Sequence, residues 1–499
     1  MLSLSQVKDL IWPIKRNELK LFMPMALMMF CILFNFSALR SVKDALVIPT
    51  LGAEIISFMK LWVVLPSALI VTICYAKLSN IFTSEYTFYI VVSTFLSIFL
   101  IFTFILYPNQ ELYHVSPDII NRLVIEYPHF KWFVKLASHW SYVLIYVFAE
   151  LWSVVVINLM FWQFANHIVD SRKAKRFYPY IAMIGNLGLI FAGNAVVYFS
   201  SSNSYVYLFL ENLTPNKLND TEITLKLIII LISIVGIIAM GILRYMHVCI
   251  FANMSKTELA HIPTDTKTNL SMRESLKLIM NSKYIGYILV IVICYGFVIN
   301  LLEGPWKDRV RELYPTTNEY MEFMGNFNIW MGVSCVVIGV FSSNLLRHFS
   351  WFIAALMTPL MMGITGTLFF AFVILGKYFD HTLFQSFDPL YAAVLVGAAT
   401  NLLSKSTKYS LFDSTKEMAY IPLSVELRTK GKAAAEVVGA KLGKSLGAFV
   451  QSSIFILWPT ASFDSITPVL MLVFLSVIII WFIDLRKLNI EYKKLHEED

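Results

Sequence analysis

Apolar stretches long enough to cross a lipid bilayer recur along almost the whole of this chain. At roughly 17–25 residues per span, we predict about twelve transmembrane helices. The composition agrees, because 58% of the 499 residues are hydrophobic, whereas soluble domains are about 45–50% apolar. We therefore expect an all-α polytopic membrane protein. The predicted spans are Leu21–Val42, Phe58–Tyr75, Tyr86–Leu106, Leu136–Phe164, Tyr178–Phe199, Leu227–Leu243, Tyr284–Leu302, Met324–Leu345, Trp351–Leu375, Leu390–Phe412, Ala433–Ile456 and Pro468–Ile483.

The basic residues predict how the chain lies in the membrane. No small-residue cleavage site follows the first span, so we expect that span to remain as an anchor. Lysines and arginines cluster at both ends of the chain and after even-numbered spans, which predicts two cytoplasmic termini. The basic stretch Lys307–Arg311 departs from this rule. The formal net charge of +7 fits this bias better than a nucleic-acid partner.

The chain divides near its middle into two halves of similar organisation. The polar segment Asn253–Ser275 separates two sets of six predicted spans. The end of the first span, Arg40–Asp44, is echoed by Glu303–Asp308 after the seventh. We predict an N-terminal bundle at 1–250, a cytoplasmic linker at 251–278 and a C-terminal bundle at 279–499. Two such parallel repeats are typical of the major facilitator architecture, in which substrate binds between the halves near the bilayer midplane.

Four charged residues lie within or beside the apolar runs, at Lys43, Glu150, Glu303 and Lys444. A charge at membrane depth costs about 2.5–3.5 kcal/mol on insertion scales, so such residues usually serve a function. Lys444 lies too deep in the eleventh span for easy snorkelling, although an ion pair is a structural alternative. Glu150 has apolar neighbours on both sides, and Asn158 lies about two turns further along, roughly on the same helical face.

The remaining candidates lie at span ends, where a structural role is the alternative. Glu303 precedes Gly304 and Pro305, which we expect to end the seventh helix. Arg40 and Lys43 close the first span, where a lysine can also snorkel to the interface.

Several other motifs argue against enzymatic or metal chemistry. The sequence Gly443-Lys444-Ser445 lacks the first glycine of a phosphate-binding P-loop, because Val438 stands there and no strand precedes it. The five cysteines show no ligand spacing. We expect no metal, no cofactor and no enzymatic activity. The glycines that recur every fourth residue from Gly439 to Gly447 favour close helix packing.

The charge types favour a polyanionic substrate. Two or more basic side chains at cavity depth suit a phosphate chain, and lysine binds phosphate as a point charge. A proton-coupled symporter for another anionic solute, with Glu150 as proton carrier, is the alternative from a different class.

Seven segments in order along the chain resemble the ATP/ADP translocases of intracellular bacteria and plastids. They are Phe36–Asp44, Tyr146–Trp152, Phe161–Asn166, Asn300–Lys307, Lys408–Leu423, Lys430–Ala434 and Leu442–Gly447. The resemblance implies a major-facilitator-like exchanger of host ATP for bacterial ADP, and leaves open whether phosphate accompanies ADP. It also leaves open GTP, UTP or CTP as substrates.

The resemblance also implies which residues bind substrate. The important lysines of the family fall on Lys43 and Lys444, and its intramembrane glutamates on Glu150 and Glu303. We predict that Lys43, Lys444 and Arg40 bind phosphates, while the two glutamates balance these cations or order the sugar and base. We expect a monomer that exchanges ATP and ADP by alternating access, without hydrolysis.

Overall fold

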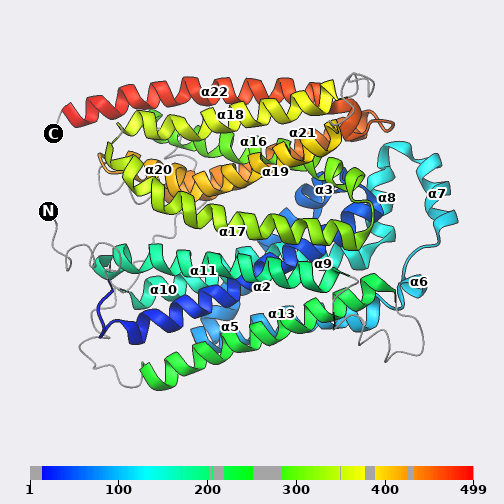
Figure 1. Cartoon of the computed structure of the whole chain (residues 1–499), viewed down its shortest axis with the longest axis horizontal. Coiled ribbons are helices and arrows are strands. Elements are labelled where there is room, and N and C mark those ends of the chain that lie inside the picture. The colour runs from blue at the N-terminus through cyan, green and yellow to red at the C-terminus, as the bar shows by residue number, and fades with distance from the viewer. Residues whose placement is uncertain are drawn as a thin grey trace.

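The computed structural model confirms the predicted all-α membrane fold (Figure 1). It describes residues 14–169, 171–201, 205, 219–250, 282–348, 350–376, 388–423 and 432–497. Within those ranges every regular element is a helix. Ten of these helical segments are long and apolar enough to cross a membrane.

The first half of the chain supplies six long helical segments, several of which change from α- to π-helix along their length. Shorter helices, α6 to α8, connect the third segment to the fourth. The elements are α2 (Leu19–Leu51), α3 (Ile55–Phe58), η1 (Met59–Val64), α4 (Leu65–Ile81), α5 (Ser84–Ile101), η2 (Phe102–Leu106), α6 (Gln110–Tyr113), α7 (Pro117–Glu126), η3 (Pro128–Phe130), α8 (Lys131–Ser138), α9 (Trp140–Trp152), η4 (Ser153–Phe161), α10 (Trp162–Ile168), α11 (Ser171–Ser200), α13 (Asp220–Tyr245) and η5 (Met246–Ile250).

The second half supplies the rest of the bundle. Its elements are α16 (Lys283–Leu313), α17 (Thr317–His348), α18 (Trp351–Leu375), α19 (Pro389–Thr407), η7 (Lys408–Phe412), α20 (Asp413–Ala419), α21 (Lys432–Leu457) and α22 (Phe463–Glu497).

Two of the twelve predicted spans, the tenth and the eleventh, correspond to α19 and α21, which lie outside the ten most apolar segments. Both carry lysines near or within their apolar stretch, Lys405 in α19 and Lys444 in α21. The stretch Leu442–Leu457 of α21 is apolar, so the structure is compatible with twelve spans.

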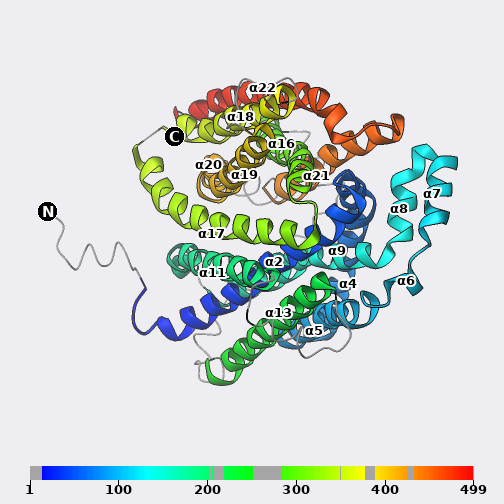
Figure 2. The same cartoon turned by 45° about the vertical axis from the view of Figure 1, so that its right-hand side comes forward.

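The helices of the two halves pack in matching patterns. In the first half α2 packs against α9, α11 and α13, and in the second half α16 packs against α19, α21 and α22. The two groups lie side by side, with α17 against α2 and α11 at the seam between them (Figures 1 and 2). The predicted linker, 251–278, lies outside the described residues.

The molecule has two ends that matter for the site. The start of α2 and the end of α22 lie at the same end of the molecule, on the left of Figure 1, and we name this the terminal end. The helices α3, α7 and α8 lie at the opposite end, which we name the α8 end. Both α2 and α16 run from the terminal end toward the α8 end.

Gly304 and Pro305 do not end the seventh helix, contrary to the sequence-based prediction, because α16 continues to Leu313. Proline has no N–H, so the carbonyl of Leu301 loses its partner within the helix. Gln451 Nε2, on α21, approaches the Leu301 carbonyl oxygen at 3.5 Å and donates to that of Asn300 at 3.0 Å. This substitute donor allows the helix to pass through the proline, so Glu303 lies inside α16 rather than at its lip.

The glycines of α21 allow the close approach to α16 that their spacing predicts. A Cβ added to Gly443 would lie 2.6 Å from the carbonyl oxygen of Ile293, and one added to Gly447 would lie 2.7 Å from Asn300 Cβ. Both distances are shorter than van der Waals contact, so α21 and α16 touch through their backbones.

Replacement of Gly443 by alanine should therefore lower stability by about 1–3 kcal/mol, because the added methyl group overpacks the contact. Gly241 is the matched control, since nothing lies within 4 Å of an added Cβ there. Thermal unfolding of the purified variants in detergent tests this. Equal unfolding temperatures for Gly443→Ala and Gly241→Ala would contradict it.

Candidate functional site

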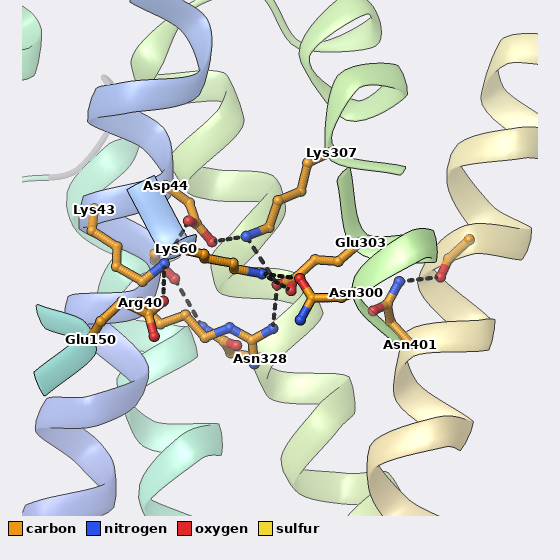
Figure 3. Close-up of polar contacts among 12 residues, drawn as sticks. Arg40, Lys43, Asp44, Lys60, Glu150, Asn300, Glu303, Lys307, Asn328 and Asn401 are labelled. Carbon is orange, nitrogen blue, oxygen red and sulfur yellow. Dashed lines mark hydrogen bonds and ion pairs between the residues drawn. The ribbon is translucent and has the colours of Figure 1, made fainter. Parts of the chain in front are cut away.

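Seven charged side chains meet where α2, η1 and α9 of the first half face α16 of the second (Figure 3). We name this group the ion network. Its members are Arg40, Lys43, Asp44, Lys60, Glu150, Glu303 and Lys307.

Lys43 is the centre of the part that belongs to the first half. Its Nζ lies 2.7 Å from Asp44 Oδ1 and 2.9 Å from Glu150 Oε1. The same nitrogen lies 4.1 Å from the ring centroid of Tyr146, a favourable cation–π position. Lys43 is 3% exposed and lies well before the end of α2, so it does not snorkel to the interface.

Three contacts carry the network across the seam between the halves. Lys307 Nζ, on α16, lies 2.8 Å from Asp44 Oδ2 on α2. Lys60 Nζ, on η1, lies 2.6 Å from Glu303 Oε2 and donates to Asn300 Oδ1 at 3.1 Å. Asp44 therefore links Lys43 of the first half to Lys307 of the second. Glu303 of the second half likewise forms an ion pair with Lys60 of the first.

Arg40 and Asn328 add further polar contacts at the seam. Arg40 Nη2 lies 3.8 Å from Glu303 Oε1. Asn328 Nδ2, on α17, donates to Ser41 Oγ at 2.9 Å and to the Ser37 carbonyl oxygen at 3.2 Å, both on α2. Hydrogen bonds as well as ion pairs therefore hold α2 to the second half.

Exposure changes through the network in one direction. The side chains of Asp44 and Lys307, nearer the α8 end on their helices, are 0% and 1% exposed. Those of Arg40 and Glu303, one turn nearer the terminal end, are 12% and 16% exposed, and that of Glu150 is 30% exposed. Solvent thus reaches Arg40, Glu303 and Glu150 but does not reach Asp44 and Lys307.

A second set of contacts joins the halves closer to the α8 end. His129 Nδ1, on η3, lies 2.7 Å from the carbonyl oxygen of Ile456, and Lys131 Nζ donates to that of Pro459. Both acceptors lie at or after the end of α21. Burial lowers the pKa of Lys131, which lies outside the spans. The molecule is thus closed at the α8 end by two layers, these contacts and the buried part of the ion network.

Positive charge exceeds negative charge in the site. The ion network contains four cations and three carboxylates. Lys405 of α19 and Lys444 of α21 add two further cations that interact electrostatically with Glu303. An excess of positive charge at membrane depth is costly unless an anion offsets it, so this arrangement suits an anionic ligand.

Lys444 differs from the other predicted lysine in being exposed. Leu442, Leu446 and Phe449 form the outward face of α21, and at 3.6 residues per turn Lys444 lies on the opposite side of the helix. Its charge interacts with Glu150 and Glu303, although among the described residues it forms no ion pair. Lys444 is thus placed to face the site rather than lipid.

Asn158 lies apart from the ion network. It falls within the π-helical stretch η4 and its side chain is exposed. The expected shared face with Glu150 assumed 3.6 residues per turn, which a π-helix does not follow. Its participation in binding stays a prediction.

The sequence reasoning placed Arg40, Lys43, Glu150 and Glu303 in one site, and the structure brings these four together. It missed Asp44, Lys60 and Lys307. Asp44 and Lys307 belong to the two segments that echo each other between the halves, Arg40–Asp44 and Glu303–Asp308, and this echo is the sequence signal for them. Lys60 lies near the start of the second apolar run, where a lysine is not unusual.

Comparison with known proteins agrees with this fold. A family model described as TLC ATP/ADP transporter matches residues 2–492. The chain is 57% identical over 494 residues to ADP,ATP carrier protein 3 of Rickettsia bellii (strain RML369-C), covering 98% of each chain. It is 42% identical over 497 residues to ADP,ATP carrier protein 1 of the same organism, covering 99% of this chain and 97% of the relative.

Solved structures of distant transporters share the architecture. A bacterial metal transporter superposes with a TM-score of 0.55 at 12% identity, over 94% of this chain and 98% of that chain. A mutant of the nucleoside transporter NupG superposes with a TM-score of 0.53 at 12% identity, over 93% and 98%. These likenesses show the major-facilitator-like fold alone. The match to the family model over nearly its full length shows that this chain belongs to the TLC ATP/ADP transporter family.

Proposed function

We propose that this protein exchanges external ATP for internal ADP across a bacterial inner membrane, without hydrolysing either nucleotide. The observation that carries the proposal is the excess of cations in a network that joins two helical bundles, in a chain whose relatives are named ADP,ATP carriers. A nucleotide polyphosphate is the anion that this charge suits best.

Alternating access follows from the layout of the network. In our proposal the bundles at 1–250 and 279–499 rock against each other, and the segment 251–278 connects them. With both termini cytoplasmic, the terminal end faces the cytoplasm. The partly exposed layer of Arg40 and Glu303 is then accessible from inside, while Asp44 and Lys307 close the outside.

Substrate binding and the ion pairs compete for the same cations. In the empty site Glu150 and Glu303 neutralise Lys43 and Lys60. Phosphate groups that bind Lys43, Lys444 and Arg40 would free the carboxylates to hydrogen-bond the sugar or base, with Asn158 as a further polar contact. The change of the carrier between its outward-open and inward-open states should be slow without substrate, because the ion pairs that join the halves would have to break with no ligand to replace them. Obligate exchange is the expected consequence.

A proton-coupled symporter fits the observations less well than an exchanger. A proton-coupled symporter would use Glu150 as its proton carrier, yet Glu150 is paired with Lys43 at 2.9 Å. Transport of another nucleotide, or of phosphate together with ADP, would use the same cations, so competition experiments decide between these substrates.

Reconstituted vesicles test the proposal. Vesicles preloaded with ADP should accumulate labelled ATP, and empty vesicles should accumulate at least about tenfold less, since the carrier returns only when loaded. A β,γ-nonhydrolysable ATP analogue should enter at a similar rate, because no bond is cleaved. Uptake that ignores internal nucleotide and collapses with an uncoupler would contradict exchange and favour the symporter.

A further inference from the structure

Each half carries a helix that changes from α- to π-helix along its length, with an acid near the end of the α-helical part in the first half and a base near it in the second. The segment α9–η4–α10 changes from α- to π-helix at Ser153, and α19–η7–α20 changes at Lys408. Glu150 precedes the first of these changes by three residues, and Lys405 precedes the second by three residues. Single π-helical stretches within α-helices often occur at functional sites.

The neighbours of these two residues also match. In the first half, α9 packs against α2, which carries the sequence Lys43-Asp44. In the second half, α19 packs against α16, which carries the sequence Lys307-Asp308. Glu150 and Lys405 therefore occupy equivalent places in the two repeats, each beside a lysine on the central helix of its own half.

The charges at these equivalent places are opposite. Lys43 meets the carboxylate of Glu150 at 2.9 Å. At the equivalent place in the second half, the counterpart of Lys43 is Lys307 and the counterpart of Glu150 is Lys405. These two are both cations, and they repel each other. The acid of the first half has thus been replaced by a base in the second. Lys307 is itself paired with Asp44 at 2.8 Å and with Glu303 at 3.0 Å, so among the described residues the cation that lacks an anion at this place is Lys405.

Lys405 has no ion-pair partner among the described residues. Arg40, Lys307 and Lys60 act on it as like charges, and Glu303 is the only carboxylate among its main charged neighbours. Glu303 already receives Lys60 at 2.6 Å and Lys307 at 3.0 Å. Within the described ranges, the Lys405 charge faces the ring of Phe327, whose centroid is 5.9 Å from Nζ. Lys405 is partly buried, and an aromatic face offsets only part of the cost of burying a cation.

Arg40 approaches the same ring from the other half of the molecule. Its Cζ also lies 5.9 Å from the centroid of Phe327. Arg40 and Lys405 are therefore no farther apart than twice this distance, a gap that a polyphosphate chain can bridge. One cation comes from α2 and the other from α19, so an anion between them would draw the two halves together.

We propose that Lys405 is a further substrate-binding residue, which with Arg40 binds the phosphate chain of the nucleotide across the seam between the halves. The inference rests on the proposed function. In it, the phosphates of the substrate supply the negative charge that the second half lacks beside Lys405. Without substrate, the repulsion between Arg40 of the first half and Lys405 of the second opposes closure of the two halves around Phe327. Bound phosphates remove that repulsion, which couples closure to the presence of substrate.

The number of phosphates should then determine how much each nucleotide depends on Lys405. Replacement by glutamine should raise the KM for ATP about tenfold to a hundredfold, as expected for the loss of one charge-assisted hydrogen bond. Competition by ADP should weaken less than competition by ATP. The Lys405→Arg variant should keep the KM within a few-fold of the wild-type value, since it retains the charge.

A stability measurement separates binding from a structural role. Because Lys405 lacks an ion-pair partner in the described part of the chain, Lys405→Gln should unfold at the wild-type temperature or above it without nucleotide. The rise in unfolding temperature on adding ATP should be smaller than for the wild type. The control is Lys226→Gln on α13, which removes a partly buried lysine paired with Glu222 at 2.6 Å. It should leave the KM unchanged.

The outcomes distinguish the two proposals. Wild-type vesicles that fail to exchange ATP for ADP would overturn the proposed function and this inference with it. Wild-type exchange together with a normal KM for Lys405→Gln would overturn the inference alone. Loss of stability in nucleotide-free Lys405→Gln, with an unchanged response to ATP, would show that Lys405 is structural and would also overturn it.

Discussion

Replacement of Asp44 by asparagine should reduce exchange at least about a hundredfold and open the α8 end. Asp44 is fully buried and is the carboxylate that joins Lys43 to Lys307 across the seam. Its removal leaves two buried ammonium groups without that partner, and breaking a buried pair costs about 3–5 kcal/mol. That cost falls on the closed arrangement, so its population should fall by a factor on the order of 10²–10⁴.

Spin labels on the two halves can measure this opening. Tyr127 and Trp458 are both exposed and lie beside the contact between η3 and the end of α21. In a cysteine-free background, the distance between labels at these positions should be short and narrow, and Asp44→Asn should add a longer population. Glu222→Gln is the control, because it breaks an ion pair of similar length away from the seam. Unchanged distances with normal exchange would exclude Asp44 from the closure.

Replacement of Lys43 by methionine should also reduce exchange at least about a hundredfold, for two separable reasons. The change removes a cation proposed to bind phosphate, and it leaves the carboxylate of Glu150 without its partner at 2.9 Å. Adding Glu150→Gln to this variant should restore part of the maximal rate, about tenfold, because the stranded charge disappears. The KM should stay raised, because the phosphate-binding cation is still missing.

This double-mutant cycle distinguishes a binding role from a purely structural one. If Lys43 only neutralises Glu150, the double variant should recover both the rate and the KM. If the effects of the two replacements simply add, the ion pair seen in the structure has no part in transport. Initial rates over a range of external ATP concentrations supply both constants.

The sequence predicted the membrane fold because lipid leaves few alternatives. Long apolar runs specify spans, and a lone charge such as Glu150 or Lys444 stands out against them. The prediction was wrong about the end of the seventh helix. Pro305 normally ends a helix, and only the position of Gln451 on a distant helix explains why α16 continues. That compensation depends on tertiary structure and leaves no local signal.

The composition of the site was harder to predict than its location. Lys60, Asp44 and Lys307 lie near the ends of apolar runs, where basic and acidic residues are common and inexpensive. Only the packing of α2 and η1 against α16 buries them together. Lys405 interrupts the apolar run of the tenth predicted span, and the structure places that charge near the ring of Phe327, which Arg40 also approaches.

The most direct test of the account is a structure of the full chain determined with bound ATP. We expect density for the phosphate chain between the two halves, in hydrogen-bonding distance of Lys444 and of Lys405 or Arg40, with the Lys43–Glu150 contact lengthened. Phosphates bound elsewhere, with every ion pair of the network intact and those three cations facing no ligand, would contradict the account.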